Sequence, residues 1–286
     1  MLGLWASPRA RAISPECSIK QTTGISLMLG TIAGDVIGSV YEVDRIKHTD
    51  FPLFSTWSRF TDDTVLTVAT AHALLTGQPY ADAYHEFGNR YPRAGYGGAF
   101  RQWLSRPDRK PYNSFGNGSA MRVGPVGLAM RSADEVLAEA VQSAAATHDH
   151  TEGIRGAQAV ALATFLARTG HAKDAIRQEI QAQLGYDLSR TLGAIRPVYE
   201  YDVTCQGSVP EAITAFLESD GVESAIRLAI SLGGDADTQA AIAGGIAEAF
   251  YGGVPDPIRA EVLSRLPQEF HEVIAEFNER FGARGE

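Results

Sequence analysis

Carboxylates gather in two short segments that are chemically alike. The first reads Phe60-Thr-Asp-Asp-Thr64, and the second reads Gly233-Gly-Asp-Ala-Asp-Thr238. Each offers a hydroxyl and two carboxylates directly ahead of an apolar run with helical spacing. Asp, Ser and Thr at a helix N-terminus accept hydrogen bonds from free backbone N–H groups and suit the helix dipole. Taken singly, each segment is therefore interpreted as a helix cap.

Two such segments in one chain favour a metal centre. A cap uses one side chain, so the second Asp of each segment has no capping role. If the two helix starts converge, their carboxylates repel one another unless one is protonated or a cation is bound. Oxygen ligands of this kind select Mg²⁺ or Mn²⁺ over Zn²⁺. One bridging carboxylate would give a two-metal site with ions about 3.5–4 Å apart. The convergence is a hypothesis.

A third acidic segment runs from Gly34 to Glu42 and contains Asp35. Asp35 and Glu42 are seven residues apart, so on a continuous helix they share a face. The simpler alternative gives Asp35 a cap or a salt bridge and makes Glu42 a solvated charge.

Two glycine-rich loops could hold an anion. They read Arg93-Ala-Gly-Tyr-Gly-Gly98 and Ser114-Phe-Gly-Asn-Gly-Ser-Ala-Met-Arg122. Glycine lets backbone N–H groups approach an anion closely, and a following helix adds its positive end. Neither loop fits the Walker or dinucleotide-binding fingerprint. Structural turns are the simpler interpretation of both loops.

Two histidines stand close together in Thr147-His-Asp-His150. Histidines two residues apart could bind zinc, but no third soft ligand is nearby. A single loop histidine that caps a helix or stacks on a ring is the favoured interpretation.

The elements that must position these residues are helices. Apolar residues recur at spacings of three and four along most of the chain after Met28. Ser132 with Glu135 three residues later forms a capping-box pattern. The expected helices are 64–75, 99–104, 133–146, 156–168, 211–217, 222–232, 238–251 and 270–281, and the best strand candidate is 196–203. The pattern predicts one compact all-α domain over residues 28–286.

Composition narrows the class of protein. With 44% apolar and 21% charged residues among 286, the chain is a globular protein rather than a disordered one. The net charge of −9 argues against nucleic-acid binding. Two cysteines, Cys17 and Cys205, are too few for a disulfide framework, so a reducing cytoplasm is expected. The uncharged run Gln21–Gly34 has 14 residues, whereas a membrane-spanning helix needs about 20.

The first 27 residues lack helical or strand periodicity and contain Pro8 and Pro15. We expect residues 1–27 to be a disordered arm or the product of an upstream start codon. A transit peptide is the weaker alternative.

Together these segments resemble the ADP-ribosylglycohydrolase family, which includes the dinitrogenase-reductase-activating glycohydrolases. The resemblance runs from about Met28 to Tyr251 and depends on the order and separation of its motifs. The motifs are Gly34-Asp35…Glu42, Thr61-Asp-Asp-Thr64, Gly95-Tyr-Gly97, Gly116-Asn-Gly-Ser-Ala-Met-Arg122, His148 and Gly234-Asp-Ala-Asp-Thr238. The resemblance implies a single-domain orthogonal helical bundle with two Mg²⁺, or Mn²⁺, ions.

The resemblance also implies a set of site residues. The metal ligands would be Thr61, Asp62, Asp63, Asp235, Asp237 and Thr238. ADP-ribose would lie against Gly95, Tyr96, Gly97, Gly98, Phe115, Gly116, Asn117, Gly118, Ser119, Met121 and His148, with Glu42 beside its distal ribose.

The implied reaction removes ADP-ribose from a modified side chain, arginine being the family's commonest acceptor. Cleavage at the anomeric carbon builds positive charge, which a carboxylate can stabilise while it or a neighbour activates water. We assign that role to Glu42, with Asp63 or Asp237 positioning the water. The expected partners are an ADP-ribosylated protein or conjugate, with no membrane and no nucleic acid, and a monomer is favoured.

Two alternatives remain open. The chain could be a non-enzymatic relative that binds ADP-ribose, or a hydrolase of small ADP-ribose conjugates. The retained Glu42 and the four aspartates favour an enzyme, because a binding protein could lose them.

Overall fold

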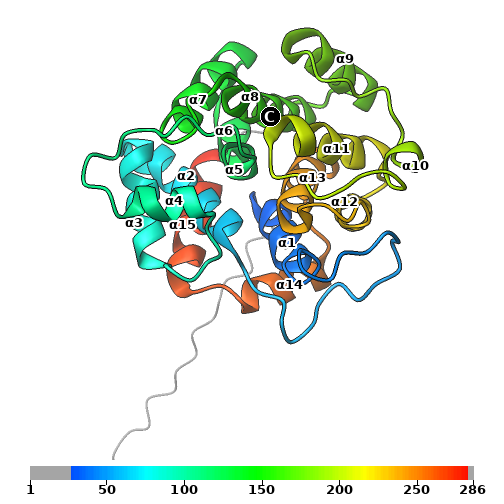
Figure 1. Ribbon diagram of the computed structural model, residues 1–286, viewed down its shortest axis with the longest axis horizontal. Helices are drawn as coiled ribbons and strands as arrows, with labels where there is room; N and C mark the ends of the chain where they lie inside the picture. Colours follow the sequence, from blue (N-terminus) through cyan, green and yellow to red (C-terminus); the bar gives the residue numbers. More distant parts are fainter. Residues whose placement is uncertain (1–26, 283–286) are drawn as a thin grey trace, which may run out of the picture.

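The structure, a computed structural model, describes residues 27–282. The expected arm over residues 1–27, apart from Leu27, lies outside the described residues. The first helices are α1 (Leu29–Gly38), α2 (Asp62–Thr76), α3 (Tyr80–Arg90), α4 (Gly98–Leu104), α5 (Gly118–Met121), α6 (Gly124–Ala129), α7 (Ala133–Ala145) and α8 (Thr151–Arg168). Then follow α9 (Lys173–Leu184), α10 (Leu192–Ile195), α11 (Cys205–Glu218), α12 (Val222–Ile230), α13 (Ala236–Tyr251), α14 (Asp256–Ser264) and α15 (Gln268–Phe281). The described chain is all-α, as the sequence predicts (Figure 1).

Local signals set many of the helix ends. The Ser132 hydroxyl accepts a hydrogen bond from the N–H of Glu135 at the start of α7, which confirms the cap. The Glu135 carboxylate accepts from the N–H of Arg131, one residue earlier than a standard capping box requires. Gly77 ends α2 with φ of 76° and Gly252 ends α13 with φ of 83°, a left-handed conformation that glycine adopts without strain.

Three expectations from the sequence are wrong. Residues 196–203 form no strand, and within the described chain an isolated bridge between Gly116 and Thr204 is the one β contact. Helix α11 begins at Cys205 rather than at residue 211, because Pro210 is accommodated inside it. Helix α1 ends at Gly38, so Asp35 and Glu42 do not share a continuous helix.

Glycines bring α1 unusually close to α13. Gly30, Gly34 and Gly38 recur every fourth residue on one side of α1. A Cβ atom at Gly34 would lie 2.1 Å from the backbone oxygen of Ala240, and one at Gly30 would lie 2.3 Å from that of Gly244. Only glycine permits this approach. As a result, α1 lies beside α13 at the centre of the molecule (Figure 1).

The buried apolar residues of the described chain form one continuous cluster. Helix α8 is buried along most of its length, as its Ala, Val, Leu and Phe composition predicts, and it packs between α7 and α13. Helix α15 covers α2 with its apolar stripe. Among the described helices, none has both the length and the apolar character needed to cross a lipid bilayer.

Candidate active site

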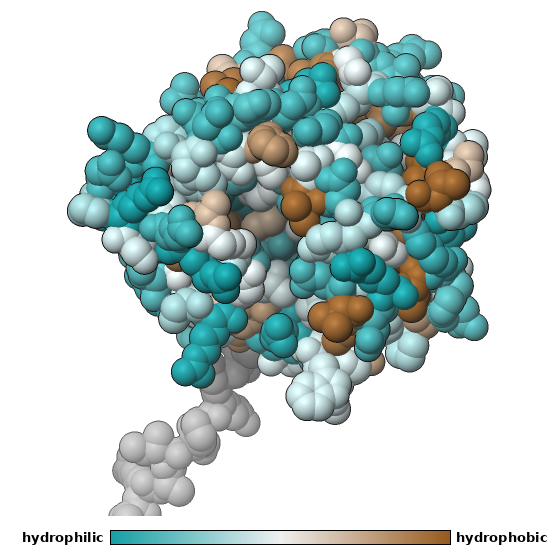
Figure 2. All heavy atoms as spheres, in the orientation of Figure 1, coloured by the Kyte–Doolittle hydropathy of each residue, from teal (hydrophilic) through white to brown (hydrophobic). Residues whose placement is uncertain are grey.

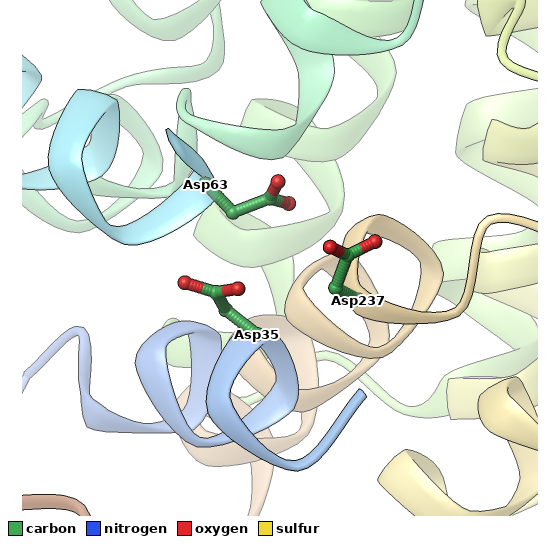
Figure 3. A group of neighbouring side chains, drawn as sticks. All are labelled: Asp35, Asp63 and Asp237. Atoms are coloured by element: carbon green, nitrogen blue, oxygen red, sulfur yellow. The ribbon is translucent and has the colours of Figure 1, made fainter. Parts of the chain in front are cut away.

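Three helices converge on a buried group of carboxylates. Asp35 of α1, Asp63 of α2 and Asp237 of α13 point toward one another (Figure 3). Each offers an oxygen within 4.8 Å of an oxygen of the other two. Glu42, Asp235 and Asp237 form a second group under the same limit. Since Asp237 belongs to both groups, the carboxylates make one continuous cluster.

The start of α2 is capped mainly from another helix. Oδ2 of Asp35 accepts hydrogen bonds from the N–H groups of Thr61, at 2.8 Å, and Thr64, at 3.0 Å. Oδ1 of Asp35 accepts from the Thr61 hydroxyl at 2.6 Å, and the Thr64 hydroxyl also donates to this carboxylate. The Thr61 hydroxyl accepts from the N–H of Asp63 at 3.4 Å. Neither Asp62 nor Asp63 is therefore needed as a cap.

The start of α13 does not follow the capping interpretation. Asp235 occupies the N-cap position, yet its side chain accepts no capping hydrogen bond. Its Oδ2 instead accepts from the side-chain amide of Asn117, at 2.7 Å. The Thr238 hydroxyl donates across to Oδ2 of Asp63, at 3.3 Å, and so links α13 to α2. The two acidic helix starts thus converge, as the metal-centre hypothesis requires.

Burial raises the pKa of every aspartate in and beside the cluster, and neighbouring carboxylates add to the rise for all of them except Asp35. Burial raises the pKa of Asp62 to about 8, with the Asp35 charge adding to it, and burial raises that of Asp235 to about 6. The pKa values of Asp63 and Asp237 rise well above the ordinary range, first through burial and then through neighbouring carboxylates. Burial likewise raises the pKa of Asp35. Without a cation, Asp62 would hold a proton at neutral pH, and ionising all the neighbouring carboxylates together is unfavourable.

The donor set fits a hard divalent cation. All the clustered side chains offer oxygen, which suits Mg²⁺ or Mn²⁺. Oδ1 of Asp63 is fully buried and has no hydrogen-bond partner within the described residues. A buried carboxylate oxygen is rarely left unpaired in a protein. A bound cation would satisfy it and would remove the repulsion within the cluster.

Five of the six predicted metal ligands are buried at the cluster, and the sixth, Asp62, lies at its margin. Thr61, Asp63, Asp235, Asp237 and Thr238 are buried at its centre. Asp62 is half-buried and belongs to neither group of converging carboxylates; its Oδ1 lies 3.3 Å from the position of a Cβ at Gly95. Their role as ligands stays a prediction.

The sequence predicted a capping role for Asp35 but not its place in the carboxylate cluster. The cap that the sequence allowed for it is confirmed, but the helix that it caps lies 26 residues further along the chain. Its place beside Asp63 and Asp237 was not anticipated. The available signal was the Gly34-Asp35 pair within a glycine repeat of helical spacing.

Glu42 lies beyond the end of α1, at the edge of the cluster. It is half-buried, and its Oε1 accepts a hydrogen bond from the hydroxyl of Tyr201 at 3.4 Å. The guanidinium of Arg45 stacks on the Tyr201 ring at 4.2 Å. Glu42 is therefore the carboxylate of the cluster that is most open to a ligand entering from this edge, and its catalytic role stays a prediction.

The first glycine loop lies next to Asp62. Gly95 has φ of 108°, and no atom lies within 4 Å of a Cβ built at Gly97 or Gly98, so the space above the loop is open. Tyr96, in contrast, is buried and stacks on Phe100 at 5.1 Å. Its ring packs in the core, so Tyr96 could contact a ligand only through its backbone or its buried hydroxyl.

The second glycine loop lies between the carboxylates and His148. Asn117 bonds Asp235, as described above, while the Ser119 hydroxyl donates to the backbone oxygen of Gly153 and is fully buried. Met121 is buried, and its sulfur accepts from the Thr238 hydroxyl at 3.7 Å. Phe115 is 45% exposed and contacts the His150 ring. Of these four side chains, only Phe115 is presented to solvent.

Figure 2 shows this face of the molecule hollowed near its centre, where α1, α5 and α13 meet in Figure 1. Helices α1 and α13 carry carboxylates of the cluster, and α5 begins in the second glycine loop. Two helices that carry carboxylates of the cluster, and the helix that follows the second glycine loop, thus border this hollow.

A family model described as ADP-ribosylglycohydrolase matches residues 23–286. The chain belongs to the ADP-ribosylglycohydrolase family. This match bears out the resemblance seen in the sequence motifs. Membership of the ADP-ribosylglycohydrolase family supports a hydrolase that acts on ADP-ribose conjugates.

Individual members of the ADP-ribosylglycohydrolase family match most of the chain. ADP-ribosylhydrolase ARH3 of Bos taurus is 30% identical in an alignment that covers 79% of this chain and 84% of the relative. ADP-ribosylarginine hydrolase Tri1 of Pseudomonas putida (strain GB-1) is 25% identical in an alignment that covers 95% of this chain and 78% of the relative. A solved structure described as an ADP-ribosylglycohydrolase-related protein complex superimposes with a TM-score of 0.68 at 26% identity, covering 90% of this chain and 96% of that one.

Proposed function

We propose that this protein is a metal-dependent hydrolase that cleaves the glycosidic bond between ADP-ribose and a modified acceptor, and so reverses ADP-ribosylation. The observation that carries the proposal is the convergence of Asp35, Asp63 and Asp237 from three helices, with Glu42 at the open edge. Family membership supplies the substrate class.

The cations would be held by the oxygens of the two helix starts. We propose two Mg²⁺ or Mn²⁺ ions on Thr61, Asp62, Asp63, Asp235, Asp237 and Thr238. Oδ2 of Asp35 already accepts three hydrogen bonds, so Asp35 chiefly fixes the start of α2. When bound, such ions orient the ribose hydroxyls and lower the pKa of a water molecule.

The chain's own carboxylates manage the proton and the positive charge. Water adds its oxygen to the anomeric carbon as the bond to the acceptor breaks. One water proton passes to a carboxylate, and the departing acceptor takes up that proton, which returns the carboxylate to its starting state. Glu42 is half-buried at the edge of the cluster, where it can take that proton or stabilise the oxocarbenium-like charge. Asp63 and Asp237 lie deeper and would position the water.

The glycine loops would hold the rest of the substrate. The open space above Gly97 and Gly98 leaves room for a diphosphate or ribose beside Asp62. Exposed Phe115 offers a ring on which a base can stack, and His148 lies beneath the second loop. Carboxylates at one end and glycine N–H groups at the other suit a ligand with a diol at one end and phosphates in its middle.

Arginine is the acceptor that we propose first. A guanidinium carries positive charge and pairs well with carboxylates. Glu42 and Asp62 are the two partly exposed carboxylates of the site. The relative Tri1 is named an ADP-ribosylarginine hydrolase.

The test is release of ADP-ribose from an arginine-modified protein, followed by mass spectrometry. We expect release with Mg²⁺ or Mn²⁺, loss of release in EDTA and recovery when the cation is restored. Binding of ADP-ribose without any release would instead establish the non-enzymatic alternative. A parallel panel of serine-linked protein and small ADP-ribose conjugates fixes the acceptor, since the fastest turnover identifies it.

A further inference from the structure

A buried guanidinium lies behind the second glycine loop. Arg122 has no exposed area, and its guanidinium lies over the Tyr84 ring, 3.9 Å from the centroid. Its Nη2 donates to the Thr147 hydroxyl at 2.8 Å and to the backbone oxygen of Ser143 at 3.4 Å. Its Nε and Nη1 have no hydrogen-bond partner within the described residues. Buried charges are normally paired, so an unpaired one needs a reason.

Thr147 connects this cation to the His148 ring. The Thr147 hydroxyl lies 2.7 Å from Nδ1 of His148. Arginine can only donate hydrogen bonds, so the hydroxyl accepts from Arg122. Within the described residues Nδ1 is the one acceptor for the hydroxyl's own proton, which makes Nδ1 the acceptor and leaves the ring proton on Nε2. Burial, and then the Arg122 charge, lower the pKa of His148 well below its usual value, which favours the neutral ring.

The protonated nitrogen faces the glycine loop. A Cβ at Gly118 would lie 3.3 Å from Nε2 of His148, and one at Gly116 would lie 3.7 Å away. A side chain at Gly118 would therefore crowd this nitrogen. Nε2 keeps a small exposed area, and it makes no hydrogen bond within the described residues. The N–H is thus open to a ligand at the loop.

We propose that Arg122 and Thr147 are positioning residues that hold His148 as a neutral Nε2–H donor to an anionic oxygen bound at the loop from Gly116 to Gly118. The fixed positive charge of Arg122 behind the ring adds attraction for that anion. The inference rests on the proposed function for the ligand, which would be the diphosphate of ADP-ribose. A merely structural Arg122 would need neither the tautomer nor the open nitrogen.

The test combines nitrogen NMR of the ring with ligand binding. Protein labelled with ¹⁵N-histidine is compared with a His148→Gln variant to assign the two ring nitrogens of His148. We expect Nε2 protonated and Nδ1 unprotonated throughout about pH 6–8, where an ordinary histidine titrates. A ring that is charged in this range, or protonated on Nδ1, overturns the proposal whatever the activity.

Thr147 allows a matched pair of variants. Thr147→Val removes the hydroxyl at nearly constant shape, whereas Thr147→Ser keeps it. We expect Thr147→Val to weaken binding of ADP-ribose and of inorganic pyrophosphate about tenfold, the scale of one lost hydrogen bond, and Thr147→Ser to restore it. Thr164→Val is the control, because Thr164 is equally buried but bonds only within its own helix.

The outcomes separate this inference from the proposed function. Equal binding by wild-type and Thr147→Val proteins overturns the positioning role. If wild-type protein binds pyrophosphate in the expected pattern yet releases ADP-ribose from no conjugate, the inference stands and the proposed function fails.

Discussion

The N-termini of α2 and α13 carry nearly the same residue types but are built differently. At α2, Thr61 and the distant Asp35 satisfy the free N–H groups. At α13, Asp235 stands in the capping position but bonds Asn117 instead. At both starts at least one carboxylate of the helix points into the cluster, Asp63 at α2 and Asp237 at α13, although Oδ1 of Asp237 also accepts from the N–H of Thr238 at 2.9 Å. A helix start rich in Asp can therefore serve a site rather than the helix.

Glu248 provides a useful contrast to Asp35. Its Oε2 accepts a hydrogen bond from the N–H of Gly30 at 2.9 Å, so α13 caps α1 from a distance just as α1 caps α2. Burial raises the pKa of Glu248 to about 8. Glu248 belongs to neither group of converging carboxylates. Two buried carboxylates thus do the same structural work, and only Asp35 borders the site.

The largest effect is expected from removing one aspartate at each helix start. The Asp62→Ala/Asp237→Ala double variant should fold, because neither residue occupies an N-cap position and only one first-turn hydrogen bond, from the N–H of Thr238 to Asp237, is lost. Metal-dependent release of ADP-ribose should fall at least about 10³-fold, because the variant removes one proposed metal ligand from the N-terminus of each helix and so weakens the electrostatic stabilisation of the transition state. Asp134→Ala is the matched control, an exposed Asp in the first turn of an ordinary helix. Undiminished turnover in the double variant would contradict the proposed function.

Glu42→Gln should separate binding from chemistry. We expect turnover to fall about 10²-fold, the usual scale for losing a general base, with metal and ADP-ribose binding retained. Calorimetry and single-turnover release measure the two quantities. Tyr201→Phe, which removes only the hydrogen bond to Glu42, should have a much smaller effect. Near-normal turnover in Glu42→Gln would move the base role to another group.

Asp35→Asn and Glu248→Gln should distinguish the two distant caps. Each replaces a buried carboxyl that accepts hydrogen bonds from a helix start, so each should lower the free energy of unfolding by about 1–3 kcal/mol. Only Asp35→Asn should also weaken Mg²⁺ binding, because Asp35 lies beside Asp63 and Asp237. Urea unfolding and metal titration provide the comparison. Equal loss of Mg²⁺ affinity in both variants would show that the cluster depends on α1 position rather than on Asp35.

A smaller effect is expected in the pH dependence of stability. The folded pKa values of Asp62, about 8, and Asp235, about 6, lie above those of an unfolded chain, so the metal-free folded state binds more protons. Its stability should therefore fall as pH rises from about 5 to 8. With Mg²⁺ bound, the fall in melting temperature between about pH 5 and 8 should be smaller by a few degrees than in the metal-free protein. Melting curves in EDTA and in Mg²⁺ measure this difference. Glu248, whose pKa is also raised, lies outside the cluster, so it contributes equally to both sets of curves and does not affect the difference. An unchanged slope would argue against ion binding at these groups.

Much of the helical framework follows from local sequence. Helices α2, α7, α8 and α13 lie where apolar spacing predicts them, and α12 ends two residues earlier than expected. The strand predicted at residues 196–203 is absent although its Tyr and Val content is typical of strands. Val198 and Val203 are exposed, and the backbone oxygen of Val203 accepts a single hydrogen bond, from the N–H of Asn117, without a ladder forming in the described chain. The start of α11 was predicted at residue 211 because proline usually interrupts a helix, whereas α11 continues through Pro210.

The sequence by itself determined the chemistry of this protein: which segments carry paired carboxylates, which carry flexible glycine, and that helices precede or follow them. Those are local properties, since capping, helical period and ligand type depend on neighbours in the chain. Only the tertiary structure decided that Asp35 caps α2, that Asp235 bonds Asn117, and that Arg122 lies behind His148. Asp35 reaches its place because Gly30 and Gly34 let α1 approach α13 closely. Contacts between segments so far apart in the chain leave no periodic signal in the sequence.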